Sequence, residues 1–358
     1  MASAWARPAG SSAPGAAAEH IARGLSPGPR RGHDGGMRAV HVLELAGPEG
    51  LTVVEVPEPP AGGGVLVDIQ AAGVSFADLL VSQGRYQLRE EPPFIPGMEA
   101  AGTVRVAPEG CGLAAGDRVC GSVSGAFAEV AVGRPRNLFR LPDSLSWAEG
   151  AALTVNYQTA LFALVERARF EAGESLLVLG AAGGTGTSVI QVARGLGASK
   201  IVGLVSTEEK ARVARDAGAD EVVLISDKWK DEARTAAGPA GFDVVYDPVG
   251  DDLFLDGLRT LAPHGRLIVI GFAGGSIPQL KVNRLLLNNI AVVGAAWGEA
   301  MRREPEMPAR IHERLLPLIE RGFIRPPIGA SFPLERVADA YRRFAERTAV
   351  GKIILDVR

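Results

Sequence analysis

The feature that most constrains this chain is an apolar run that ends in a glycine-rich turn and continues as a helix. Leu176–Leu179 has the composition of a buried strand, Gly180–Gly186 contains four glycines, and Thr187–Leu196 has a helical pattern. Small residues let the backbone approach a pyrophosphate, and the first turn of a helix offers free N–H groups. The turn has Ala181 where a glycine is usual, so the motif is A-x-G-x-x-G. The segment predicts a dinucleotide phosphate site.

Strands and helices alternate after this turn, which predicts a parallel sheet with right-handed crossovers. The expected strands are Ser175–Leu179, Ile201–Val205, Glu221–Leu224, Asp243–Tyr246, Leu267–Ile270 and Ile290–Val293. Thr207, followed by two glutamates, is expected to cap one of the intervening helices. Beyond Pro305 the pattern predicts a helix to about Arg321, a second over Leu334–Arg347 and a final strand over Lys352–Asp356.

The part of the chain before this alternation has a different pattern. Residues 37 to about 155 alternate short β-branched runs with Pro/Gly turns, which predicts an all-β region. Residues 1–36 are dominated by Ala, Gly, Pro and Ser with scattered arginines, and we expect a disordered extension there. A transit peptide is the alternative for this extension, because it bears arginines and few acids.

Charge and cysteine content exclude several classes of protein. The net charge of −3 argues against nucleic-acid binding through a basic surface. The two cysteines, Cys111 and Cys120, cannot build a disulfide framework, so we expect a reducing, cytoplasmic location, with mitochondria as the alternative if the extension is a transit peptide. No apolar run approaches the ~18–20 residues of a membrane span, so no membrane partner is expected.

The cofactor class follows from the end of the second parallel strand. An NAD-binding chain places an acidic residue there, about 20 residues past the glycine turn, to hold the ribose 2′-OH. This chain has Ser206 at that point and Lys210 four residues later. The Ser206 hydroxyl and the Lys210 ammonium suit the negatively charged 2′-phosphate of NADPH better than the neutral 2′-hydroxyl of NADH, so we predict NADPH. The predicted contacts are Ala182, Gly183, Gly184, Thr185, Gly186, Ser206 and Lys210.

Several passages in fixed order carry a family resemblance. They are Ala72–Leu80, Gly84–Tyr86, Pro93–Gly102, Ala151–Ala160, Asp243–Gly250 and Gly265–Gly275. From Met37 onward the chain resembles the zinc-free medium-chain dehydrogenases/reductases, and within them the quinone oxidoreductase branch. The resemblance implies an α/β protein with a GroES-like β-barrel domain at 37–158 and 300–358. A Rossmann doubly wound parallel-sheet domain, 159–299, is then inserted into it.

The resemblance also implies residue roles. Tyr86, Ser75 and Asp78 match the part of the family's first domain that faces the acceptor, and are candidate catalytic residues. Thr159 matches a position at the nicotinamide end of the cofactor. Three further candidate contacts, Gly250, Gly271 and Phe272, stand at strand carboxyl ends, where open α/β sheets bind ligands. The chain departs from the family where Ser75 replaces an Asn, Leu80 a Tyr and Ile225 a Tyr.

Zinc-dependent relatives place a Cys and a His where this chain has Ser75 and Met98. The five histidines lie far from that region in sequence, and two cysteines alone cannot close a tetrahedral site. We therefore expect no metal.

Without a metal, an electron-poor acceptor is the natural hydride acceptor. The expected activity is reduction of a quinone or an α,β-unsaturated carbonyl by NADPH. The alternatives are an enoyl-thioester reductase and a low-turnover, crystallin-like NADPH-binding protein. A homodimer through the edge strand Ile290–Val293 is an expectation of the resemblance.

Overall fold

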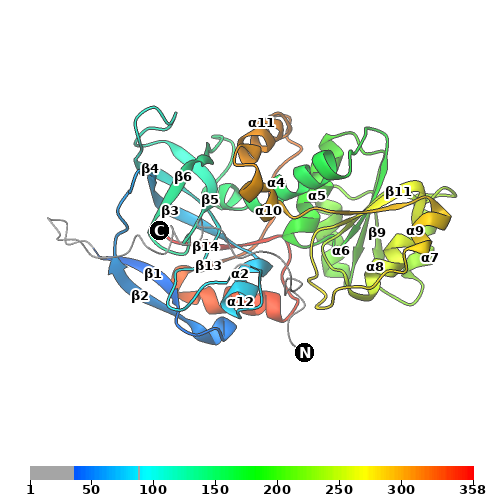
Figure 1. The fold of residues 1–358 in the computed structure, drawn as a ribbon, viewed down its shortest axis with the longest axis horizontal. Coiled ribbons are helices and arrows are strands. Elements are labelled where there is room, and N and C mark those ends of the chain that lie inside the picture. Colours follow the sequence, from blue (N-terminus) through cyan, green and yellow to red (C-terminus); the bar gives the residue numbers. More distant parts are fainter. Residues whose placement is uncertain (1–35, 88) are drawn as a thin grey trace.

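Two six-stranded sheets form the two lobes of the molecule (Figure 1). The computed structural model describes residues 36–87 and 89–358. The predicted disordered extension, residues 1–36, therefore lies outside the described residues except for Gly36, which begins a strand.

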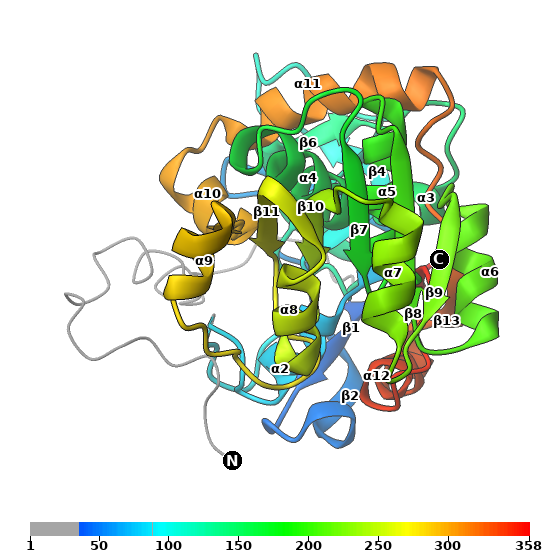
Figure 2. The same ribbon diagram turned by 90° about the vertical axis from the view of Figure 1, so that its right-hand side faces the viewer.

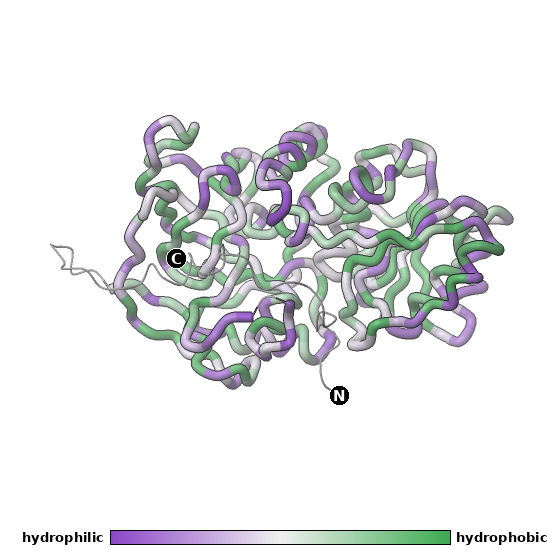
Figure 3. The backbone as a smooth tube through the Cα atoms, viewed as in Figure 1, coloured by the Kyte–Doolittle hydropathy of each residue, from purple (hydrophilic) through white to green (hydrophobic). Residues whose placement is uncertain are grey.

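The first sheet is parallel throughout and has the strand order β12-β11-β10-β7-β8-β9. Its strands are β7 (Ser175–Leu179), β8 (Lys200–Val205), β9 (Glu221–Leu224), β10 (Phe242–Asp247), β11 (Leu261–Val269) and β12 (Ala291–Gly294). All six predicted strands are confirmed. The start of β11 differs most from its prediction, because Leu261 already pairs with Phe242 ahead of a register shift. The strands are predominantly hydrophobic (Figure 3), as burial on both faces requires.

Helices cover both faces of the parallel sheet (Figure 2). Helices α5 (Gly184–Gly195) and α6 (Glu208–Asp216) share one hydrophobic core with Leu176 and Val178 of β7. Helices α7 (Trp229–Ala237) and α8 (Asp251–Leu258) share another with Leu177 and Leu179. Alternate residues of one strand thus face opposite layers, and the predicted doubly wound fold is confirmed.

The second sheet closes on itself. Strands β3 (Val65–Val74), β4 (Glu99–Val106), β5 (Arg118–Val123) and β6 (Val130–Arg140) pair in turn, and β6 pairs back onto β3. The ring is extended by β14 (Lys352–Asp356), antiparallel to β3, and by β13 (Ile328–Pro333). A separate hairpin joins β1 (Gly36–Val42) to β2 (Leu51–Pro57).

The GroES-like barrel is therefore present, and a C-terminal strand completes it. Helix α4 (Thr154–Leu161) runs through the predicted boundary at 158/159 and continues as a π-helical segment, Phe162–Arg167. The domain boundaries stay predictions.

The prediction of an all-β region before residue 155 is wrong. Helices α2 (Phe76–Ser82) and α3 (Trp147–Ala151) interrupt it, and α4 begins inside it. Ser75 and Asp78 form a capping box at the start of α2, and Ser146 and Glu149 form one at the start of α3. These reciprocal bonds satisfy the free N–H groups of a first helical turn and allow short helices between strands.

The remaining elements lie in the C-terminal half or flank the barrel. They are the helices α9 (Asn283–Asn288), α10 (Trp297–Arg303), α11 (Met307–Glu320) and α12 (Val337–Ala345), with 3₁₀ turns η1 (Gly47–Gly50) and η3 (Leu334–Arg336). The helix predicted over Leu334–Arg347 is thus a 3₁₀ turn followed by α12. Val282, just before α9, and Leu286 and Leu287 within it are about three-quarters exposed. Within 36–87 and 89–358, every helix is too short or too polar to cross a bilayer.

Candidate functional site

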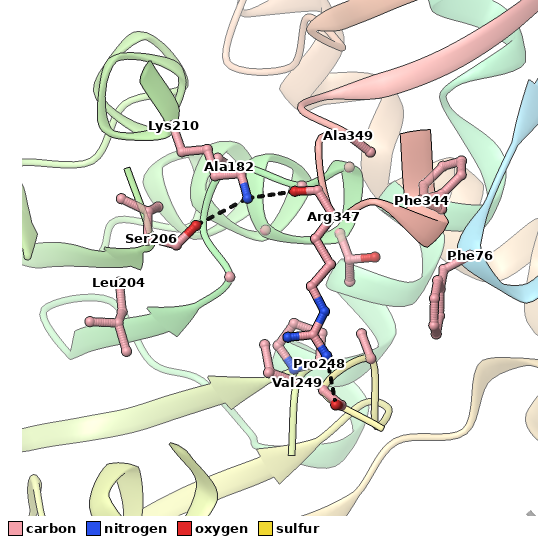
Figure 4. A pocket seen from close by; sticks show the side chains of 18 of the residues that line it. Phe76, Ala182, Leu204, Ser206, Lys210, Pro248, Val249, Phe344, Arg347 and Ala349 are labelled. Atoms are coloured by element: carbon pink, nitrogen blue, oxygen red, sulfur yellow. Dashed lines mark hydrogen bonds between the residues drawn. The ribbon is translucent and has the colours of Figure 1, made fainter. Parts of the chain in front are cut away.

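A cavity of about 460 Å³ lies where the carboxyl ends of β7, β8 and β10 face the barrel (Figure 4). The parallel sheet contributes the glycine turn, the end of β8 and the loop after β10. The barrel domain contributes Val74, Ser75 and Phe76, and the segment after α12 contributes Arg347, Gly351 and Lys352. Ligands of open α/β sheets bind at this edge.

The glycine turn forms one wall of the cavity, and all five predicted residues from Ala182 to Gly186 line it. Gly183 is the extended N-cap of α5 and has no side-chain cap, so the first N–H groups of a 12-residue helix face the cavity without a side-chain partner. A Cβ on Gly186 would lie 2.4 Å from the Gly180 carbonyl oxygen. The turn therefore has the close packing and the free donors that a diphosphate needs.

A second strand edge meets the turn from across the domain interface. The Gly351 N–H donates to the Ala182 carbonyl oxygen at 2.7 Å, and Gly183 and Gly351 form a parallel bridge. A Cβ on Gly184 would lie 2.4 Å from Asn156 Nδ2, which places this buried amide of α4 against the start of α5. Residues from the barrel domain thus complete the wall around the phosphate turn.

Lys210 lies at the end of the cavity near β8, and the Arg347 side chain runs from there towards Pro248 and Val249 (Figure 4). Lys210 Nζ donates to Ser206 Oγ at 3.1 Å and to the Arg347 carbonyl oxygen at 2.9 Å. The Arg347 guanidinium reaches the Gly274 carbonyl oxygen at 3.0 Å. Burial lowers the pKa of Lys210, against the raising effect of the Glu209 charge and with a smaller lowering effect of the Arg347 charge. Both side chains line the cavity, whereas Glu208 and Glu209 do not.

Ser75 lines the barrel side of the cavity. Its Oγ lies 2.5 Å from Asp78 Oδ2, which also accepts the Ser75 N–H at 2.7 Å. Asp78 itself is 2% exposed and does not line the cavity. Burial raises the pKa of Asp78 to about 6, against the lowering effect of the Ser75 hydrogen bonds and the Lys352 charge.

The other predicted site residues lie behind the lining. Tyr86 follows α2, and burial and the Asp78 charge raise its pKa. The Thr159 hydroxyl donates to the Val155 carbonyl oxygen at 2.5 Å within α4. Gly250, in left-handed backbone at φ +69°, packs on Phe272, and Gly271 lies by Pro248. In the cavity wall itself, their neighbours Pro248, Val249, Ala273 and Gly274 take these places.

Four residues at or beneath the cavity were missed by sequence reasoning: Asn156, Arg347, Lys352 and Glu99. Lys352 did give a signal, because it is a cation directly ahead of three apolar residues, Ile353, Ile354 and Leu355, in a strand that is buried as far as Leu355. Arg347 gave none, since it follows an amphipathic helix where a solvated arginine is ordinary.

Sequence comparisons match both domains. Residues 61–143 match the alcohol dehydrogenase GroES-like domain, and residues 184–315 match the family described as zinc-binding dehydrogenase. The chain is 39% identical over 326 residues to quinone oxidoreductase-like protein 2 of Bos taurus, covering 90% of this chain and 93% of that protein. It is 32% identical to quinone oxidoreductase of Homo sapiens, covering 89% and 97%. The chain belongs to the quinone oxidoreductase family of medium-chain dehydrogenases/reductases.

Solved structures agree with membership of the quinone oxidoreductase family. A Mycobacterium abscessus protein described as a probable oxidoreductase is 42% identical and superposes with a TM-score of 0.83, covering 91% of this chain and all (100%) of that one. A mycobacterial protein solved in complex with NADPH is 31% identical, with a TM-score of 0.82 and coverage of 90% and 100%. The chain is therefore an oxidoreductase whose fold binds a nicotinamide cofactor.

The family matched by residues 184–315 is described as zinc-binding, so a zinc site would need a set of suitable donor side chains. Across the described ranges, no group of three or more His, Cys, Asp or Glu side chains is arranged to hold a metal ion. Burial raises the pKa of Cys120 to about 12, which disfavours the thiolate that zinc requires. The expectation of no metal, which rests on Ser75 and Met98, stays a prediction.

Proposed function

We propose that this chain is a metal-independent, NADPH-dependent reductase of quinones or other electron-poor α,β-unsaturated carbonyls. The observation that carries the proposal is Lys210, which donates to Ser206 Oγ at the end of β8 and lines the cavity together with it. A 2′-phosphate brings negative charge and several acceptor oxygens, and this pair offers one hydroxyl and one ammonium. A ribose hydroxyl would bring no negative charge to the Lys210 ammonium.

The cavity supports the rest of the cofactor as well. The free N–H groups of α5 and the small residues Ala182–Gly186 suit a diphosphate. A bound NADPH would supply the hydride. The residues of this chain would hold the acceptor near Ser75, exclude water and return a proton to the product.

The proton donor that the geometry favours is Ser75, because this residue lines the cavity and its hydroxyl contacts a carboxyl of raised pKa. Tyr86 is the second candidate from the same region. Its phenol is partly buried near Asp78, whose charge raises the Tyr86 pKa, and a raised pKa makes the phenol a weaker acid.

Replacement of Lys210 tests the cofactor preference. Lys210→Ala is expected to weaken NADPH binding by about 10-fold or more and to leave NADH binding nearly unchanged, since a hydrogen bond to a charged group contributes about 1.5–3 kcal/mol. Fluorescence titration with each cofactor measures both constants. Arg212→Ala is the matched control, an exposed cation on the same helix that does not line the cavity. An unchanged NADPH to NADH ratio in Lys210→Ala would refute the assignment.

An acceptor panel tests the reaction itself. Para- and ortho-quinones, enones and enoyl-CoA are each mixed with the protein and NADPH, and loss of NADPH absorbance is followed. Consumption with quinones or enones supports the proposal, and consumption with enoyl-CoA alone would favour a thioester reductase. Tight NADPH binding with no turnover on any acceptor would favour a binding protein.

We also propose that two copies associate through the edge of the parallel sheet, and that the protein acts in the cytoplasm. Among the described residues, strand β12 stands at the edge of the parallel sheet, and the segment that precedes it in the chain exposes Val282, Leu286 and Leu287. An open strand edge next to exposed leucines is a suitable surface for a second copy.

A further inference from the structure

Three buried ionisable residues and one partly buried serine lie together at the barrel side of the cavity. We call this group the acid cluster and define it as Ser75, Asp78, Glu99 and Lys352. Ser75 and Lys352 line the cavity, while Asp78 and Glu99 lie behind them. The side chains of Glu99 and Lys352 are only 1% and 3% exposed. Charged groups are seldom buried this deeply unless they are paired.

Glu99 and Lys352 form an ion pair that the surrounding backbone fixes in place. Glu99 Oε1 pairs with Lys352 Nζ, and Oε2 accepts the Val155 N–H at 2.8 Å and the Thr154 hydroxyl at 3.1 Å. These donors lie at the first turn of α4, where the helix dipole favours a carboxylate. A Cβ on Gly73 would lie 2.8 Å from both Glu99 Oε1 and Lys352 Cε, so the ion pair packs directly against the backbone of Gly73.

The charges of this cluster do not balance when both carboxyls are ionised. Two carboxylates, Asp78 and Glu99, share the single ammonium of Lys352, and the Glu99 and Lys352 charges act on Asp78 in opposite directions. Tyr86 and Tyr341 also face Asp78, and the Asp78 charge raises the pKa of each phenol. The Tyr341 hydroxyl is buried and has no hydrogen-bond partner among residues 36–87 and 89–358. A proton on Asp78 removes the excess negative charge.

We propose that the Glu99–Lys352 ion pair is a positioning element that tunes how readily Asp78 passes a proton through Ser75 to the reduced acceptor. The inference rests on the proposed function. The anion left after hydride uptake by the acceptor takes the Ser75 Oγ proton, and Ser75 regains one from the Asp78 carboxyl. Asp78 becomes a carboxylate and is reprotonated from solvent. The 2.5 Å separation of Ser75 Oγ and Asp78 Oδ2 suits transfer in either direction.

The direction of the effect follows from the signs of the charges. Glu99→Gln keeps the shape and the acceptor oxygen but removes the negative charge, so the unpaired Lys352 ammonium acts on Asp78 and lowers its pKa. The double variant Glu99→Gln with Lys352→Met removes both charges and leaves no unpaired ion. In the double variant the pKa of Asp78 is expected to return towards the wild-type value.

The titration of Asp78 is measured first in the cofactor-free full chain. Carbon-13 NMR of labelled aspartate side chains follows the Asp78 carboxyl, which an Asp78→Asn sample identifies. Glu99→Gln is expected to lower its midpoint by about one pH unit or more, and the double variant to reverse most of that shift. Glu149→Gln is the matched control, because Glu149 is also a buried carboxylate in an ion pair, with Arg325 Nε at 2.9 Å, and does not line the cavity. An unchanged midpoint in Glu99→Gln would overturn the proposal.

Turnover is measured second, with an acceptor found in the panel. The pH profile of kcat is expected to move with the NMR midpoint in Glu99→Gln and to return in the double variant. A profile that stays fixed while the midpoint moves would overturn the relay. If NADPH is not consumed with any acceptor, the proposed reductase function fails, and the proton relay fails with it. A midpoint that still moves in Glu99→Gln would then show only that the Glu99 charge acts on Asp78.

Discussion

His312 gives the sharpest prediction for stability. It lies on α11, is 4% exposed, and stacks on Phe139 of β6 with ring centroids 3.9 Å apart. Its Nδ1 has no hydrogen-bond partner in the part of the chain that the structure describes. Burial lowers the pKa of His312 from 6.5 to about 4. Acidification therefore protonates His312 in the unfolded chain before it does so in the folded protein.

The size of the effect follows from linkage. As the pH falls below 6.5, the unfolded chain binds a proton that the folded chain does not, and stability is lost until the pH reaches about 4. With a pKa of 6.5 in the unfolded chain and about 4 in the folded protein, His312 alone lowers the free energy of unfolding by about 2.5 kcal/mol between pH 7 and pH 4.5. Protonation of carboxylates whose pKa is lowered in the folded protein, such as Glu129, also destabilises the protein in acid. The acid loss of the wild type alone therefore does not isolate the contribution of His312.

The assay compares variants by urea unfolding at pH 7 and pH 4.5. His312→Leu is expected to be less stable than wild type at pH 7, because it loses the ring stacking, and to lose about 2.5 kcal/mol less on acidification. His264→Asn is the control, since His264 is exposed and has a left-handed φ of +67°, which asparagine accepts. An equal acid loss in His312→Leu and wild type would refute the reasoning.

Two further predictions concern the cofactor turn and the sheet edge. Gly186→Ala places a Cβ 2.4 Å from the Gly180 carbonyl oxygen and is expected to weaken NADPH binding by about 10-fold or more; Gly298→Ala, with nothing within 4 Å, is expected to bind normally in the same fluorescence titration. Wild type is expected to sediment at twice 37.4 kDa, and a Leu286→Lys, Leu287→Lys double variant as a monomer. A wild-type monomer, or equal binding by both glycine variants, would contradict these expectations.

The parallel sheet was predictable because its signal is local. All of its strands except β11 are short runs rich in apolar residues and bounded by turns, and the helix-capping Thr207 accepts the Lys210 N–H at 3.2 Å. The short helices of the barrel domain were missed because β-type runs surround them. Their capping boxes, Ser75 with Asp78 and Ser146 with Glu149, are present in the sequence and were the available signal.

The candidate site was only partly predictable, because it joins residues distant in sequence. The turn at Ala182–Gly186 and the Lys210–Ser206 pair follow from spacing within one strand–helix unit. Arg347 and Lys352 reach the same cavity from a distant part of the chain: Arg347 is 137 residues from Lys210 in the sequence. Such contacts depend on how the barrel docks on the parallel sheet, which no local pattern encodes. Lys352 was nevertheless detectable as a buried charge in a strand.

The bridge between Gly351 and the cofactor turn has a consequence for biosynthesis. Val74 of β3 pairs with Ile353 of β14, so β3 cannot form this pairing until nearly 280 later residues have been synthesised. Contacts this distant in sequence also form slowly. The parallel-sheet lobe has its own strands and cores well before then. A growing chain on the ribosome therefore carries a shaped phosphate turn with one wall open, and it acquires a complete cofactor site only once residues 347–356 emerge.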